Sequence, residues 1–254
     1  LASLMTKPIK TNSIAPKLAF HLLSVVKFED YLRLQQSVVA ELAAGGDCIK
    51  VLLCEHAMEL TVGRKGSHAH IRIPQTERDK KNLQPRWLPR GGGAILHSPG
   101  QLAVYPLVPL QWYGWSPGRM LTMVRDAVSM ALSQVGVSTL CYDGLHSVWG
   151  RTGMLAATGI SVQQNVSCFG SYINVSPDMG LFGYVDTAWQ LPADQSRRTM
   201  SSLIAENRKA ARMANLRSAV VESFAQVFDC SDYDMYTGHP QLSPQRVLKP
   251  QPEL

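Results

Sequence analysis

The sequence of 254 residues has no apolar run long enough to cross a bilayer and no charged-then-apolar signal peptide. Its five cysteines are odd in number and scattered without a CxxC pair, which argues against a disulfide scaffold and against a zinc site. There is no internal repeat, and charged residues make up only 17% of the chain. This composition predicts one large globular domain in a reducing compartment, with no membrane span, metal or cofactor.

The formal net charge of +6, with a pI near 9.1, favours acidic partners such as nucleic acid. A solvated surface with a basic bias explains the same charge. The chain begins with Leu1 instead of Met. We therefore expect that a targeting segment was removed or is not included.

Hydrophobic periodicity predicts alternating strands and helices, and hence a mixed α/β fold with a central mixed sheet. Strands are expected at 18–26, 49–54, 71–73, 154–164 and 168–175, and helices at 28–44, 117–135 and 217–228. Residues 1–17 are expected to form an extended lead-in and 18–228 the folded domain. The Pro- and Gln-rich segment 229–254 is expected to be a loosely ordered tail.

Two segments combine basic side chains in a way that could contact phosphates. The first is a predicted polar loop at 77–90, and the second is a predicted helical stretch at 197–217. A solvated surface is the alternative for both. The candidate contact residues are Arg78, Lys80, Lys81, Arg86, Trp87, Arg197, Arg198, Arg208, Lys209 and Arg212.

Residues 90–105 are the most informative part of the chain and read RGGGAILHSPGQLAVY. Three consecutive glycines after Arg90 allow a sharp turn or a close approach of backbone to a ligand. Pro99 and Gly100 place the imidazole of His97 rigidly, and Gln101 adds an amide that can pair with a carbonyl.

This segment resembles the signature loop of the octanoyltransferase family, RGGxxTYHGPGQLxxY, although Ile95 and Leu96 replace the Thr and Tyr. Four further stretches resemble family segments in the same order: residues 53–64, the helical stripe from Val124-Arg125 onward, residues 147–160 and residues 168–175. The resemblance covers about residues 18–228 and implies the fold of the biotin/lipoate ligase and transferase superfamily, in which a central sheet forms an acyl pocket. The positions expected at the pocket are Arg90, Gly91, Gly92, Leu96, His97, Gly100, Gln101, Gly159, Gly170 and Asn174.

Family members move an octanoyl group from acyl carrier protein to a lysine of a lipoyl domain, through a thioester on a Cys that works with a Lys. In the register that the resemblance gives, Ala188 stands at the Cys position and Met154 at the Lys position. Phe169 replaces a flanking His. Alanine has no nucleophile and methionine carries neither charge nor proton. Cys168 is interpreted as a buried structural residue, and a ligase-like reaction would need the same Lys.

We interpret the chain as a catalytically inactive relative that acts as a binding or scaffold factor. The basic residues, the starting Leu1 and the family's usual organelle in eukaryotes suggest the mitochondrial matrix and a ribonucleoprotein such as the mitoribosome or its assembly intermediates. The alternative is an active octanoyltransferase with relocated catalytic residues, using acyl carrier protein. His97 either lines the pocket or acts as an acid/base, or it is a structural histidine. The pocket itself is either retained for binding a lipid or filled by side chains.

Overall fold

The computed structural model describes residues 17–242, except 47, 143, 188–199 and 210. Within these residues the central sheet has seven strands in the order β10-β1-β2-β6-β9-β8-β7, and a small sheet has the order β4-β3-β5. The strands of the large sheet are β1 (Lys17–Val26), β2 (Cys48–His56), β6 (Gln101–Leu107), β7 (Val148–Trp149), β8 (Met154–Gln163), β9 (Val166–Asn174) and β10 (Tyr233–Thr237). β1 runs parallel to β2 and β10, and the other neighbours are antiparallel. The predicted mixed α/β architecture is confirmed.

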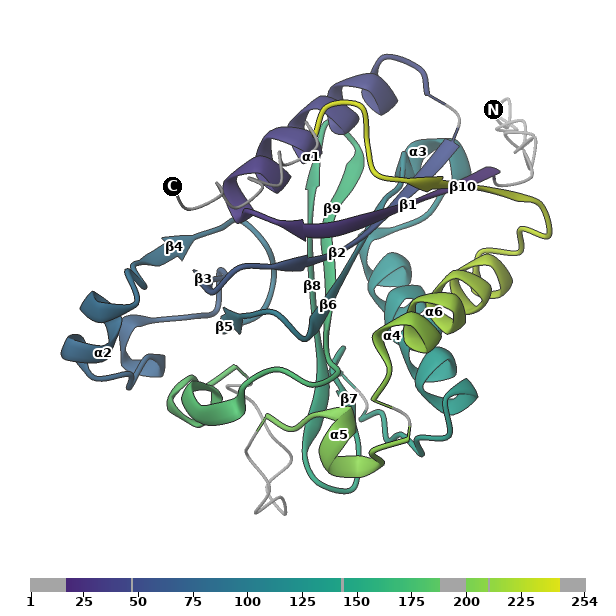
Figure 1. Ribbon diagram of the computed structural model, residues 1–254. Helices are drawn as coiled ribbons and strands as arrows, with labels where there is room; N and C mark the ends of the chain where they lie inside the picture. The colour runs from purple at the N-terminus through teal and green to yellow at the C-terminus, as the bar shows by residue number, and fades with distance from the viewer. Residues whose placement is uncertain (1–16, 47, 143, 188–199, 210, 243–254) are drawn as a thin grey trace, which may run out of the picture.

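Helices cover both faces of the large sheet (Figure 1). On one face α1 (Phe28–Ala43) packs over β2, β6 and β9, and on the other lie α4 (Pro117–Gln134) and α6 (Met213–Val227). Short helices α3 (Leu110–Tyr113) and α5 (Leu203–Glu206) connect these layers. In the part of the chain that the structure describes, none of the helices qualifies as a membrane span.

The small sheet forms a separate lobe beside the large one (Figure 1). It contains β3 (Glu59–Val62), β4 (Pro85–Trp87) and β5 (Ala94–His97). Around it lie α2 (Gln75–Lys80) and two 3-10 helices, η1 (His68–His70) and η2 (Met179–Tyr184). Its core contains Leu60, Ile73, Leu83, Leu96 and Phe182.

Several helix and strand boundaries occur at residues that the sequence predicts to lie at the ends of these elements. Ser116 caps α4, because its Oγ accepts a hydrogen bond from the Arg119 backbone 3.1 Å away, and Pro117 occupies the first helical position. Gly136, at φ 80°, follows the helix. The predicted strand pair is confirmed as β8 and β9, joined by a tight turn at Gln164 and Asn165.

Three predictions about local structure were wrong. Residues 71–73 form no strand, since only Ile71 makes an isolated bridge, to Val185. The expected loop at 77–90 contains most of α2 and all of β4, because polar side chains also suit an exposed helix and an edge strand can begin with proline. The stretch around Arg208 is not helical, since α6 begins only at Met213.

The expected tail also contains part of the sheet. β10 pairs in parallel with β1 over Leu18–Leu22, and Cys230 just before it is buried. The folded region therefore runs from Lys17 through β10, and the prediction of a loose tail from 229 onward was wrong for these residues. β10 is short and mostly exposed, so the sequence carries no alternating apolar pattern that would predict it.

Candidate functional site

The signature segment folds as a glycine loop between β4 and β5 that lies directly against β8. The Gly91 N–H donates to the Ile160 carbonyl at 2.9 Å. A Cβ on Gly159 would lie 2.4 Å from the Gly91 carbonyl oxygen, so only glycine fits at this contact. Gly92 has φ 82°, a backbone conformation that glycine adopts readily.

Arg90 is fully buried and holds this loop together. Its Nη1 donates to the carbonyls of Gly91 and Gly93, at 3.0 and 3.1 Å. Its Nη2 donates to the Thr61 carbonyl at 3.2 Å and to the Thr61 hydroxyl at 2.8 Å. Its guanidinium also lies over the Tyr172 ring, at 5.9 Å from the centroid. The buried charge therefore meets only neutral partners among these contacts.

A buried polar chain continues from Thr61 to the end of β9. The Thr61 hydroxyl donates to His97 Nε2 at 2.8 Å, and His97 Nδ1 donates to the Gln101 Oε1 at 2.9 Å. The Gln101 amide donates to Asn174 Oδ1 at 2.9 Å, and the Asn174 amide donates to the Ser201 carbonyl at 2.9 Å. Every bond can be made at once only if His97 is neutral and carries its proton on Nδ1.

Burial lowers the pKa of His97 well below its usual value, and the neighbouring His56 and Arg90 lower it further. His97 is therefore neutral at physiological pH, as the hydrogen-bond directions require. His97 does not line the cavity beside the glycine loop. Its position therefore favours a role in supporting the loop over proton transfer to a substrate.

A cavity of about 130 Å³ lies between the glycine loop and the start of β8. Of the expected pocket positions, only Arg90 and Gly92 line it. The other expected positions do not line it: they are Gly91, Leu96, His97, Gly100, Gln101, Gly159, Gly170 and Asn174. The lining residues are Lys65, Arg90, Gly92, Gly93, Ile95, Gly144, Leu145, His146, Ser147, Met154, Ala157, Thr158 and Thr187.

The structure describes two of the three positions at which the chain departs from the family's catalytic residues. Met154 lines the cavity and is 3% exposed, with its backbone carbonyl accepting from the Ser201 N–H at 2.8 Å. Phe169 lies under α1, in the buried cluster around Tyr31, with the two ring centroids 6.3 Å apart, and its backbone has a positive φ of 63°. Ala188 lies outside the described residues, although the preceding Thr187 lines the cavity.

No cysteine is among the described residues that line the cavity. Cys54 lies 3.5 Å from His56 Nε2, which resembles a nucleophile and base, but both side chains are buried under α1. Burial raises the pKa of Cys54 strongly and that of Cys168 to about 12. Both are therefore protonated structural residues. The described residues contain no cluster of His, Cys, Asp or Glu able to hold a metal ion.

Sequence reasoning missed Lys65 and His146, which bring an amine and an imidazole to the cavity. Each adjoins a segment that carries the family resemblance, at 53–64 and 147–160, without belonging to it. Burial lowers the pKa of His146, and the charges of Arg125 and Lys65 add to the effect. A search for polar residues flanking the matched segments would have found both.

The basic contact candidates do not form one surface. Arg78, Lys80, Lys81, Arg86 and Trp87 lie on or beside α2 and β4, whereas Arg208, Lys209 and Arg212 lie between α5 and α6, on the opposite side of the molecule (Figure 1). Arg86 pairs with Glu59 at 2.9 Å and Lys80 with Glu77 at 3.2 Å. Arg197 and Arg198 lie outside the described residues.

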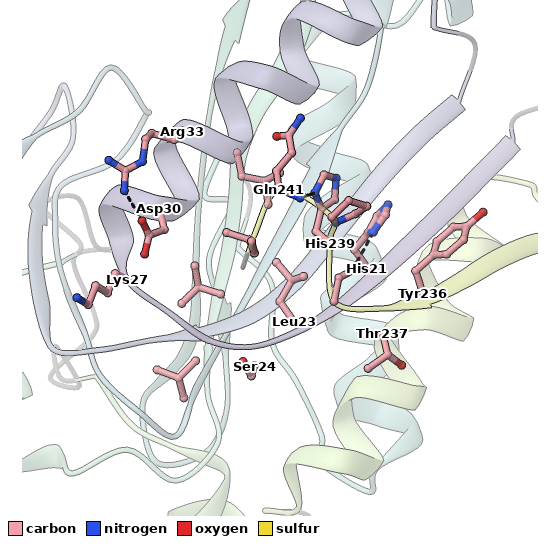
Figure 2. A pocket seen from close by; sticks show the side chains of 16 residues that line it. His21, Leu23, Ser24, Lys27, Asp30, Arg33, Tyr236, Thr237, His239 and Gln241 are labelled. Atoms are coloured by element: carbon pink, nitrogen blue, oxygen red, sulfur yellow. Dashed lines mark hydrogen bonds and ion pairs between the residues drawn. The ribbon is translucent and has the colours of Figure 1, made fainter. Parts of the chain in front are cut away.

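A larger groove, of about 960 Å³, opens where β10 leaves the edge of β1. Figure 2 shows His21, Tyr236 and His239 on one side of it, and Asp30 and Arg33 of α1 on the other. His21 stacks on Tyr236 with ring centroids 5.0 Å apart. The sequence did not predict this groove, since it depends on β10.

Comparison with known proteins gives concordant results. Residues 27–225 match the model of the lipoyl protein ligase A/B catalytic domain. The chain is 32% identical to an octanoyltransferase of Citrifermentans bemidjiense over 64% of its own length and 76% of the relative's. It is 29% identical to an octanoyltransferase of Chloroflexus aggregans, over 77% and 88% of the two chains.

Two solved structures share the fold at low identity. Lipoate-protein ligase A bound with ATP superimposes with a TM-score of 0.65 at 13% identity, over 90% of this chain and 91% of the other. A bi-partite lipoate protein ligase from Thermoplasma acidophilum gives a TM-score of 0.59 at 14% identity, over 88% and 89% of the chains.

Proposed function

Since the chain belongs to the lipoyl protein ligase A/B catalytic-domain family and is octanoyltransferase-like within it, we propose that it is a binding member of this family that does not carry out octanoyl transfer. The observation that carries the proposal is Met154. This side chain stands at the cavity wall, where the resemblance expects the reactive lysine, and it is 3% exposed. Methionine cannot stabilise a thiolate by charge or move a proton.

The position of the cysteines supports the same proposal. Acyl transfer through a thioester needs a thiolate within reach of the acyl group. Cys54 and Cys168 are fully buried in the layer beneath α1, and no described cysteine lines the cavity. In the register that the family resemblance gives, Ala188 stands at the cysteine position, and alanine has no nucleophilic group.

An active octanoyltransferase is the second candidate, and two observations favour it. The curated relatives that cover most of the chain are named octanoyltransferases. An amine is also present at the cavity, because Lys65 lines it from the segment after β3. The cysteine nucleophile that a thioester needs would then have to come from residues outside the described cavity lining.

Intact mass of the full chain after incubation with octanoylated acyl carrier protein separates the two candidates. We expect no gain of an octanoyl group and no transfer to a lipoyl domain. The double variant Met154→Lys with Ala188→Cys is expected to gain an octanoyl thioester, and Met154→Lys alone is the matched control without the thiol. A stable octanoyl adduct on the unmodified chain would overturn the proposal.

For the partner, we propose a mitochondrial ribonucleoprotein, in keeping with the basic surplus of the sequence. Arg208, Lys209 and Arg212 support this assignment, since all three are exposed. None of them forms an ion pair with any residue that the structure describes, so their charge is available to phosphates.

A further inference from the structure

The strand β10 forms one edge of the large sheet, and no strand of the described residues pairs with its outer side (Figure 1). An unpaired edge exposes backbone N–H and C=O groups that can pair with another chain. Lysine, proline and bulges commonly block such edges. The strand reads YDMYT and contains neither residue, and its pairing with β1 has no register shift. The outer edge is therefore open to a further strand.

Alternate residues of β10 direct their backbone groups away from β1. The Gly238 N–H donates to the Leu22 carbonyl at 2.9 Å, and Leu22 lies opposite Thr237 in the parallel register. In a parallel pair each bonded residue connects to the two neighbours of the residue opposite it, so the even-numbered residues of β10 bond to β1. The N–H and C=O groups of Tyr233, Met235 and Thr237 therefore point outward from the edge.

The two faces of β10 carry different side chains, because successive residues of a strand point to opposite faces. On one face Tyr233 contacts the core under α4 and α6, and Met235 beside it is 56% exposed. On the other face Asp234 is exposed, and Tyr236 stacks on His21. A strand that adds to this edge would meet an apolar surface on one face and an acidic one on the other.

The charge of this edge is opposite to that of the whole chain. Residues 226–242 contain three aspartates and neither Lys nor Arg, although the net charge of the chain is +6. Asp229, Asp232 and Asp234 are all exposed, and none of them forms an ion pair with another described residue. The edge therefore repels RNA and attracts a positively charged polypeptide.

We propose that the outer edge of β10 binds an extended, basic segment of a partner protein, which adds to the sheet as a further strand. Its Lys or Arg side chains lie beside Asp232 and Asp234, and its alternate, apolar side chains lie beside Met235. The inference rests on the proposed function, since it names the kind of protein partner within the ribonucleoprotein. Proteins of such a particle carry the Lys and Arg that neutralise RNA phosphates.

Fluorescence anisotropy of the full chain with a labelled peptide of alternating lysine and valine tests the proposal. We expect binding that weakens as potassium chloride increases, because salt screens exposed charges. A peptide with glutamate in place of lysine reverses the charge and is expected not to bind. A lysine-valine peptide methylated on its backbone nitrogens lacks the N–H donors for strand pairing and is also expected not to bind.

Two variants of the edge test backbone pairing and charge separately. Met235→Pro removes an outward N–H that makes no bond to β1, and an edge strand tolerates proline, so we expect a folded protein that binds the peptide about tenfold more weakly. Asp232→Asn with Asp234→Asn keeps the shape of both side chains and is expected to weaken binding about fivefold. Glu77→Gln with Asp79→Asn, on α2, removes the same charge at the same spacing and is the matched control.

Failure of the lysine-valine peptide to bind, equal binding of the glutamate peptide, or unchanged binding by the Asp232→Asn and Asp234→Asn double variant would each overturn the proposal. A dimer of the full chain that Met235→Pro abolishes would assign the edge to a second copy and overturn it too. Octanoyl transfer by a chain that still binds the peptide would overturn the proposed function alone. Absence of both transfer and peptide binding would overturn only the assignment of a partner to β10.

Discussion

At the scale of single residues, the signature histidine and glutamine act as part of a buried hydrogen-bond chain. His97 and Gln101 connect Thr61 on β3 with Asn174 at the end of β9. The chain thereby joins the small sheet to the large one and fixes the glycine loop between them. Residues that mark the family in sequence can therefore be retained for structural reasons, independently of any role in chemistry.

The two buried histidines predict a pH dependence of stability. Burial lowers the native pKa of His56 to about 4 and that of His97 well below 6.5. Above pH 6.5 both are neutral in the folded and unfolded chain, so neither contributes a slope. Below it the unfolded chain binds protons that the native state cannot, so the free energy of unfolding falls by up to ~1.4 kcal/mol per pH unit for each histidine.

Urea denaturation between pH 7.5 and 4.5 measures this slope. We expect His56→Gln to reduce the slope of the free energy of unfolding against pH by the contribution of one histidine, whatever its effect on that free energy at pH 7.5. His68→Gln, at an exposed position, is the matched control. An unchanged slope in His56→Gln would show that His56 is not buried and neutral in the native state.

At the scale of elements, the close pairing of strands in the central sheet depends on glycine. A Cβ on Gly170 would lie 2.0 Å from the Val104 carbonyl oxygen of β6. β6 and β9 pair over Gln101–Val104 and Ser171–Asn174, immediately beside this contact. The sequence places Gly170 in a family segment, but only the sheet order reveals which strand it approaches.

Gly170→Ala is accordingly expected to cost more than about 4 kcal/mol or to prevent folding, since β6 and β9 would have to separate. Gly183→Ala is the matched control, because its Cβ would meet open space, and a change within about 0.5 kcal/mol is expected. Urea denaturation followed by circular dichroism measures both. A Gly170→Ala protein as stable as the control would contradict the packing of β6 against β9.

At the scale of the whole molecule, charge is divided between two separate surfaces. The residues near α2 are partly neutralised, since Arg86 pairs with Glu59 and Lys80 with Glu77. Arg208, Lys209 and Arg212 on the opposite side are exposed. If the chain binds RNA, the second surface is expected to contribute more of the phosphate contacts.

Fluorescence anisotropy with a single-stranded RNA at increasing potassium chloride tests this expectation. Replacing Arg208, Lys209 and Arg212 by Gln should reduce the slope of log affinity against log salt by about 2, because each lost phosphate contact removes roughly 0.7. Replacing Arg78, Lys80 and Arg86 by Gln should change it less. A response of the unmodified chain that is flat with salt would remove RNA as the proposed partner.

The sequence alone predicted the α/β class and the main helices and strands, because apolar periodicity and capping residues are local signals, and the resemblance of the glycine loop predicted the family. It did not predict that Lys65 and His146 line the cavity while His97 does not, nor that β10 completes the sheet. These features depend on contacts between residues far apart in the chain. Such contacts are fixed only when the layers pack, since packing decides which side chains share a cavity and which donors stay without partners.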